Sequence, residues 1–179
     1  LHTALRYGLS QALLDAAAKA RGLSMARIIL EAYDLSPRLE RIPIFAQTGD
    51  ERYANADKMI IKGAEVIPHG LINNIDDKLG REGEKLAAYI EWLKERVEKL
   101  KPAPDYLPML HIDVYGNLGR IFDNDPAAVA RYLKSLEPAA GDHALYIEGP
   151  VDTGERASQI ELLGEIRREL EHIESRGKI

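Results

Sequence analysis

The chain has 179 residues, of which 45% are hydrophobic, and 24 Lys+Arg stand against 29 Asp+Glu for a formal net charge of −5. This balance is typical of a folded globular domain, and its acidic sign disfavours nucleic acid as a partner. Cysteine is absent, which excludes disulfides and thiolate metal sites in this sequence. We expect no membrane partner either, since no apolar stretch approaches the roughly 20 residues of a bilayer span. The opening residues do not resemble a signal peptide, so a cytoplasmic location is the default expectation.

Residues 1–40 are predicted to form a helical lead-in. Apolar residues recur at helical spacing up to Arg21, and Gly22 then provides a stop signal. Ser24 can cap a second, shorter helix at residues 25–33. The sequence therefore predicts two regions, the lead-in of residues 1–40 and a second region of residues 41–179.

Four short apolar runs alternate with helical patterns in residues 41–179. The runs lie at 42–46, 64–68, 109–112 and 144–147, helices are predicted at 51–62, 83–101, 126–136 and 158–175, and residues 177–179 resemble the start of a fifth strand. Alternating strands and helices indicate an α/β fold with a parallel sheet. The runs show little alternation of polar and apolar residues, which suits a sheet covered on both faces. No Gly-rich phosphate loop is present, which favours a partial (β/α) TIM-type barrel of about four βα units.

A polar side chain follows each predicted strand. In a parallel barrel these positions share the edge where active sites are built. Taken singly, each of these side chains could simply satisfy a loop or cap a helix, but four in succession favour a functional edge. The four residues are Gln47, His69, Asp113 and Glu148.

Asp113 and Glu148 lie about one βα unit apart, so they are predicted to end adjacent strands. Such strands are ~4.8 Å apart, so the two carboxylates can share a hard cation such as Mg²⁺, which also relieves their repulsion. Gln47 and His69 suit the binding of a substrate carboxylate or of a developing oxyanion. His111 precedes Asp113 by two residues and faces the same side of a regular strand, where a core role is favoured over a supporting one.

Long segments of the chain carry a resemblance to a known family. Together with residues 1–15 they resemble, in order and over essentially the whole chain, the methylaspartate ammonia-lyase family of the enolase superfamily. Family members are well over twice as long, and the resemblance is to their middle portion. The segments are Phe45–Tyr53, Asp57–Gly63, Pro68–Asn74, His111–Gly116 and Tyr146–Asp152.

The resemblance implies a carbon–nitrogen lyase that reversibly converts 3-methylaspartate to mesaconate and ammonia. In this family a lysine removes the proton beside a carboxylate, and Mg²⁺ stabilises the enolate-like intermediate. By correspondence, Asp113 and Glu148 are two of the three metal carboxylates, His69 is the catalytic residue that contacts the substrate carboxylate, and Gln47 binds substrate. The resemblance also implies a small amino-acid substrate, a homodimer and a role in amino-acid degradation such as glutamate fermentation, and it raises a monovalent cation as a second ion.

The resemblance places the third metal carboxylate on the strand after Ile179 and the lysine on the strand after that. The chain is therefore expected to be a fragment that lacks both groups and is inactive alone. The alternative is a non-catalytic half-barrel that associates with another half or with itself, since such a half exposes two strand edges and an apolar interior. A different member of the superfamily is disfavoured by the closeness of the motifs.

Overall fold

The computed structural model describes residues 2–38 and 40–179, and the chain divides into two units between residues 42 and 43. In the first unit, helix α1 (Thr3–Arg21) ends at Gly22, whose left-handed backbone (φ 64°) terminates the helix. Helix α2 (Met25–Ala32) begins after Ser24, whose side chain accepts a hydrogen bond from a backbone N–H of the first turn. Both helices therefore form where the capping residues predict them.

The apolar stripe of α1 remains largely exposed. Leu5, Leu9 and Leu13 have exposed fractions of 62%, 57% and 64%. An ion pair of 2.7 Å between Arg21 and Glu31 joins α1 to α2. The helices of the first unit are thus held by caps and surface charges, while the core residues lie almost entirely in the second unit.

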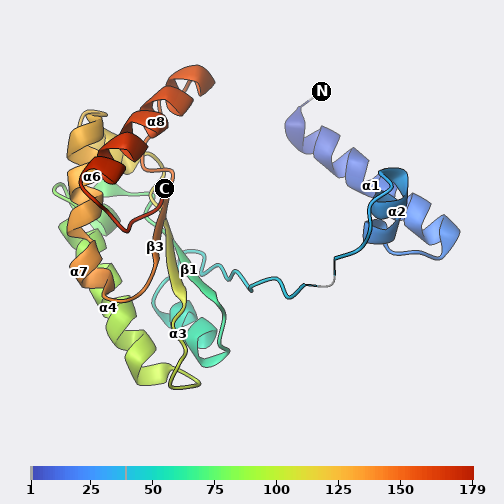
Figure 1. Cartoon of the computed structure of the whole chain (residues 1–179), viewed down its shortest axis with the longest axis horizontal. Helices are drawn as coiled ribbons and strands as arrows, with labels where there is room; N and C mark the ends of the chain where they lie inside the picture. The colour runs from blue at the N-terminus through green and yellow to red at the C-terminus, as the bar shows by residue number, and fades with distance from the viewer. Residues whose placement is uncertain (1, 39) are drawn as a thin grey trace. The chain divides into compact units, whose positions relative to one another are not determined.

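The second unit alternates strands and helices around a parallel sheet. Strands β1, β2 and β3 pair in that order, and each pair is parallel. Helices α4, α6 and α7 lie along one side of these strands (Figure 1). The arrangement is consistent with part of an α/β barrel. In chain order the elements are α3 (Ala54–Ile61), β1 (Val66–Leu71), the π-helix η1 (Ile75–Leu79), α4 (Glu84–Leu100), β2 (Met109–Asp113), α5 (Asn117–Ile121), α6 (Pro126–Ser135), α7 (Glu137–Ala140), β3 (Leu145–Glu148) and α8 (Arg156–His172).

The predicted count of four strands is not confirmed, because the outermost segments are too short to count as strands. The first predicted strand, residues 42–46, makes a single parallel bridge from Phe45 to β1. Pro43 has no N–H to extend that ladder. At the other edge, Lys178 makes a single parallel bridge to β3. In the part of the chain that the structure describes, three strands thus form the sheet, with one bridge on either side.

Helix α3 and the three long helices of the second unit match the sequence prediction, whereas η1, α5 and α7 were not predicted. Helices α4, α6 and α8 begin and end within three residues of their expected bounds, and the Asp125 side chain caps α6 by accepting from two backbone N–H groups. Elements η1, α5 and α7 have four or five residues, too few to establish a helical period. No helix in the described part of the chain is long and apolar enough to cross a membrane.

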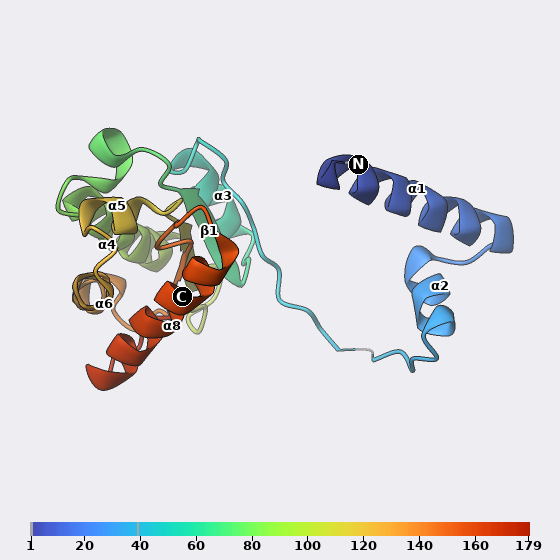
Figure 2. The ribbon, with the colours of Figure 1, turned by 90° about the horizontal axis from the view of Figure 1, so that it is seen from above.

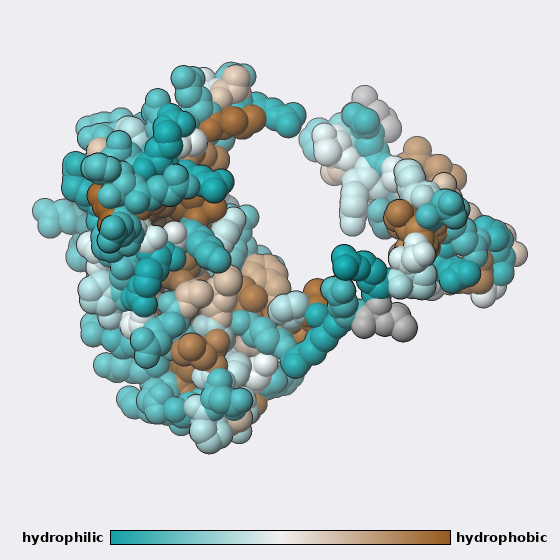
Figure 3. All heavy atoms as spheres, in the orientation of Figure 1, coloured by the Kyte–Doolittle hydropathy of each residue, from teal (hydrophilic) through white to brown (hydrophobic). Residues whose placement is uncertain are grey.

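The interior residues of β1 and β2 are all buried, as expected of strands with little alternation, whereas burial alternates along β3. Leu110, Ile112 and Ile147 are at most 1% exposed and belong to the core beneath the helices. Their neighbours in sequence, such as His111, therefore point to the opposite face of the sheet. Figure 2 shows helices α3, α4, α5, α6 and α8 of the second unit gathered around its strands, and hydrophilic residues cover most of the visible surface of this unit in Figure 3.

Candidate functional site

The carboxyl ends of β2 and β3 are fixed side by side. Asp113 and Glu148 are register partners at the last position of their strands. Beyond the strands, the Val114 N–H donates to the Glu148 carbonyl at 3.0 Å, and the Gly116 N–H donates to the Gly149 carbonyl at 2.6 Å. These backbone hydrogen bonds hold the two following loops together, so both acidic residues stand at the same edge of the sheet.

His69 lies inside β1, and the prediction that this strand ends there is wrong. The strand continues to Leu71, and the register with β2 shifts between Pro68 and Gly70. His69 has a φ of 44° and is skipped by the register. Such a bulge redirects a side chain, and here it brings the His69 ring beside His111.

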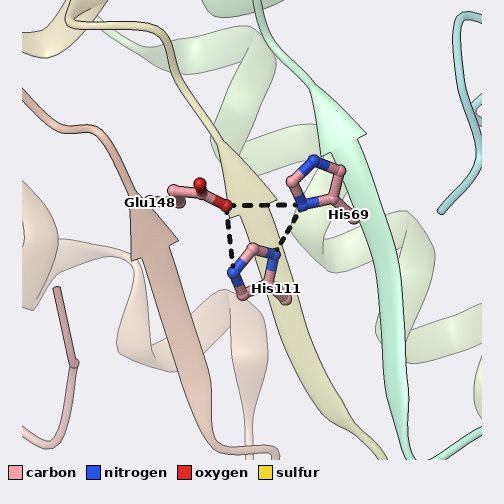
Figure 4. Close-up of side chains that lie close together, drawn as sticks. All are labelled: His69, His111 and Glu148. Carbon is pink, nitrogen blue, oxygen red and sulfur yellow. Dashed lines mark hydrogen bonds and ion pairs between the residues drawn. The ribbon is translucent and has the colours of Figure 1, made fainter. Parts of the chain in front are cut away.

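Three side chains from the three strands converge into a single cluster, the histidine–glutamate group of His69, His111 and Glu148 (Figure 4). The two Nδ1 atoms of the histidines are 3.0 Å apart. Glu148 Oε2 lies 3.3 Å from Nε2 of His111 and 3.5 Å from Nδ1 of His69. The sequence points to His69 and Glu148 but assigns His111 to the core, so the role of His111 in joining them was missed.

Aromatic rings enclose the two histidines. The His111 ring stacks between His69 and Tyr146, with centroid distances of 5.0 Å and 4.9 Å. The Phe45 ring meets both histidines edge-on. Each histidine is only 9% exposed, whereas the Glu148 side chain is 48% exposed. The carboxylate is therefore the part of the group that solvent reaches most readily.

Burial and neighbouring charge set the protonation of the site. Burial lowers the pKa of His111 below its usual value, as does the charge of His69, while Glu148 and Asp113 act in the opposite direction. His111 Nε2 and the Glu148 carboxylate thus lie within ion-pair distance, while burial opposes a charge on the ring. Burial raises the pKa of Tyr115, and the charges of Asp113 and Glu148 add to this rise. Tyr115 is a second neighbour of the site that the sequence did not single out.

The Asp113 carboxylate has a separate local partner. Its Oδ1 accepts a hydrogen bond of 3.1 Å from the backbone N–H of Tyr115. The structure thus places Asp113 at the register position opposite Glu148, while the Glu148 carboxylate turns toward the histidines. The signal that predicted this pairing was the spacing of one βα unit.

Gln47 follows the segment that runs beside β1. It is exposed and lines a pocket of about 370 Å³ together with Asn55 and Lys58. The next residue is anchored to β1, since the Thr48 N–H donates to the Pro68 carbonyl at 2.9 Å. In residues 2–38 and 40–179, no hydrogen bond or ion pair connects Gln47 with the group.

Two overlapping donor sets are available to a cation at this edge. Each residue of the histidine–glutamate group offers one ligand atom, and these atoms lie within 4.8 Å of one another. Two imidazoles with one carboxylate suit transition metals such as Zn²⁺. Mg²⁺ prefers oxygen ligands, and the carboxylates of Asp113 and Glu148 supply these from adjacent strand ends.

Two family models match the chain. The model described as methylaspartate ammonia-lyase N-terminus matches residues 1–34, and the model described as methylaspartate ammonia-lyase C-terminus matches residues 37–179. The methylaspartate ammonia-lyase of Citrobacter amalonaticus is 52% identical over 179 residues, which cover all of this chain and 43% of that protein. The enzyme of Clostridium tetanomorphum is 50% identical over 171 residues, 96% of this chain and 41% of that protein. The chain thus spans about two fifths of the length of these relatives.

Solved structures of methylaspartate ammonia-lyases are also similar to this chain. The crystal structure of the Citrobacter amalonaticus enzyme containing (2S,3S)-3-methylaspartic acid matches with a TM-score of 0.92 and 52% identity, over 98% of this chain and 43% of that one. The Mg complex of β-methylaspartase from Clostridium tetanomorphum matches with a TM-score of 0.87 and 48% identity, over 99% of this chain and 43% of that one.

Proposed function

Because the chain belongs to the methylaspartate ammonia-lyase family, we propose that its residues serve a carbon–nitrogen lyase that reversibly converts 3-methylaspartate to mesaconate and ammonia. The proposal concerns a polypeptide of the relatives' length that contains these 179 residues. One observation carries it: the carboxylates of Asp113 and Glu148 occupy paired strand ends, with the imidazole of His69 beside Glu148. Substrate and metal in the solved structures of relatives support the same chemistry.

The donor set of Asp113 and Glu148 fits Mg²⁺. Both residues offer oxygen atoms from adjacent strand ends, and the Glu148 side chain is exposed enough for an ion and its water ligands to reach it. We propose these two as metal ligands. Bound Mg²⁺ supplies positive charge at a substrate carboxylate, which makes the neighbouring proton more acidic.

His69 is proposed as the catalytic residue that contacts substrate. Its Nδ1 faces His111, and the other ring nitrogen points away from the group (Figure 4). That nitrogen is available to a substrate carboxylate. Gln47 is proposed as a further substrate-binding residue, because its exposed amide follows the segment that bridges to β1. The aromatic rings around His69 restrict water there, which strengthens polar contacts with a bound anion.

The test is an assay of mesaconate formation from 3-methylaspartate at varied Mg²⁺ concentrations. The ultraviolet absorbance of mesaconate monitors the reaction. We expect Mg²⁺-dependent turnover by the polypeptide of the relatives' length and none by the 179-residue chain alone. Asp113→Asn should lower turnover about 100-fold or more, because a metal is worth several kcal/mol of transition-state stabilisation. Asp105→Asn, an exposed carboxylate before β2, is the matched control and should leave turnover unchanged. Turnover that needs no Mg²⁺, or that survives Asp113→Asn, would refute the assignment.

Three finer expectations stay predictions. They are a homodimeric assembly, a second, monovalent cation and a cytoplasmic location. Light scattering on the purified lyase measures the assembly, and titration of turnover with a monovalent salt measures the second ion. Fractionation of the source cells measures the location.

A further inference from the structure

His111 is the one side chain of the histidine–glutamate group that uses both of its polar atoms within the group. Its Nδ1 lies 3.0 Å from Nδ1 of His69, and its Nε2 lies 3.3 Å from Oε2 of Glu148. The imidazole therefore bridges the residue proposed to contact substrate and one of the residues proposed to bind metal.

The chemistry of these partners explains why the two nitrogens of His111 serve different groups. A carboxylate oxygen only accepts hydrogen bonds, so the 3.3 Å approach of His111 Nε2 to Glu148 Oε2 is attractive when Nε2 carries a proton. Nδ1 of His111 and Nδ1 of His69 share one proton, which one ring donates and the other accepts. Nδ1 of His69 thus faces both His111 and Glu148, and its Nε2 points away from the group (Figure 4).

Packing holds the His111 ring in this orientation. Tyr146 stacks on one side with an interplanar angle of 10°, and His69 stacks with an angle of 18°. Phe45 meets the ring edge-on at 4.9 Å, and the residue is only 9% exposed. A ring fixed on three sides cannot rotate without losing both polar contacts.

We propose that His111 is a positioning residue that orients His69 toward substrate with one nitrogen and Glu148 toward the metal with the other. The proposal rests on the proposed function. It predicts two separable effects, because each nitrogen serves a different partner. Loss of the Nδ1 contact should impair the step that uses His69, and loss of the Nε2 contact should weaken Mg²⁺ binding.

Three substitutions in the lyase polypeptide separate the two contacts. His111→Phe keeps the aromatic packing and removes both nitrogens. His111→Asn keeps a polar atom close to the position of Nδ1, and His111→Gln keeps one close to the position of Nε2. His143→Phe is the control. It removes an imidazole that contacts the Pro108 carbonyl near the amino-terminal ends of β2 and β3, opposite to the candidate site.

The readouts are kcat and KM for 3-methylaspartate and, without turnover, the dissociation constant of Mg²⁺ by calorimetry. For His111→Phe we expect kcat to fall and the Mg²⁺ dissociation constant to rise, each about 10- to 100-fold, as for other residues that orient ligands. Compared with His111→Phe, His111→Asn should restore most of kcat but not the Mg²⁺ affinity. His111→Gln should restore most of the Mg²⁺ affinity but not kcat. The control should change neither.

The outcomes distinguish this inference from the proposed function. A parent polypeptide with no lyase activity would refute the proposed function, while calorimetry would still test the Glu148 contact of His111. An active parent whose Phe variant stays within about twofold in both quantities would overturn the inference. If the Phe variant fails to fold by circular dichroism, Asn and Gln decide, and equal losses of kcat and of Mg²⁺ affinity in both would reduce His111 to a packing role.

Discussion

Gly70 stands where β1 passes α4 too closely for a side chain. A Cβ at this position would lie 2.9 Å from Cε1 of Tyr89, about 0.5 Å inside the 3.4 Å at which ordinary contact begins. The Tyr89 ring is 1% exposed and has little freedom to move away. Its hydroxyl donates to the Arg52 carbonyl at 3.0 Å, and the ring stacks on Trp92 at 5.9 Å.

We therefore expect Gly70→Ala to destabilise the protein. Inserting one carbon into a closely packed site costs about 1–3 kcal/mol, and the smaller entropy of the unfolded alanine chain returns about 0.4–1 kcal/mol. The net loss in free energy of unfolding should be about 1–2 kcal/mol. Urea unfolding followed by the fluorescence of Trp92, the single tryptophan, measures it.

The same substitution at Gly164 provides the control. Gly164 lies within α8, and a Cβ there would meet its nearest neighbour, Arg168 Nη1, at an ordinary 3.6 Å. Gly164→Ala should raise the free energy of unfolding by about 0.5–1 kcal/mol. If Gly70→Ala proves as stable as the parent, or if the two substitutions change stability in the same direction, the close-contact argument is wrong.

Three further predictions concern packing and charge. Arg96 holds the pKa of Asp57 below its usual value of 3.8 through two hydrogen bonds of 2.6 Å that join α3 to α4. The pair therefore stabilises the fold above that value and ceases to do so as the pH falls through the lowered pKa. Asp57→Asn should lower the free energy of unfolding by about 1 kcal/mol at pH 7, since the pair is partly exposed; an unchanged difference from the parent in strong acid would contradict this. Ile112→Ala, at a fully buried position of β2, should cost about 2–5 kcal/mol in urea unfolding, and a cost below about 1 kcal/mol would place the residue outside the core. Asn117→Ala removes the 2.8 Å hydrogen bond from Asn117 Nδ2 to the Ile72 carbonyl and should lower the melting temperature through a loss of about 1–3 kcal/mol, whereas an unshifted melting curve would show that water replaces the amide.

Local sequence patterns decided most of the secondary structure. Gly22 and Ser24 end and begin their helices through backbone conformations and hydrogen bonds to residues at most four positions away. The stripes of α4 and α8 repeat over several turns, so their period is unambiguous. Such interactions involve near neighbours in the chain, and the sequence therefore reveals them directly.

The same reasoning reached part of the candidate site. Alternation of strands and helices placed Asp113 and Glu148 at adjacent strand ends, and the register of β2 and β3 pairs them. The sequence analysis correctly predicted that His69 lies at the same end of the sheet as Asp113 and Glu148. It did not predict the bulge that holds His69 inside β1. Bulges and registers depend on how strands fit one another, which no short window of sequence contains.

The amino-acid sequence by itself determined the family, the parallel order of the strands and the residues at their carboxyl ends. Only the tertiary structure decided that His111 lies between His69 and Glu148. A histidine in an apolar strand looks the same in sequence whether it packs in a core or joins two functional groups. The difference arises from contacts between residues about 40 positions apart, and these form only when the three strands pack together.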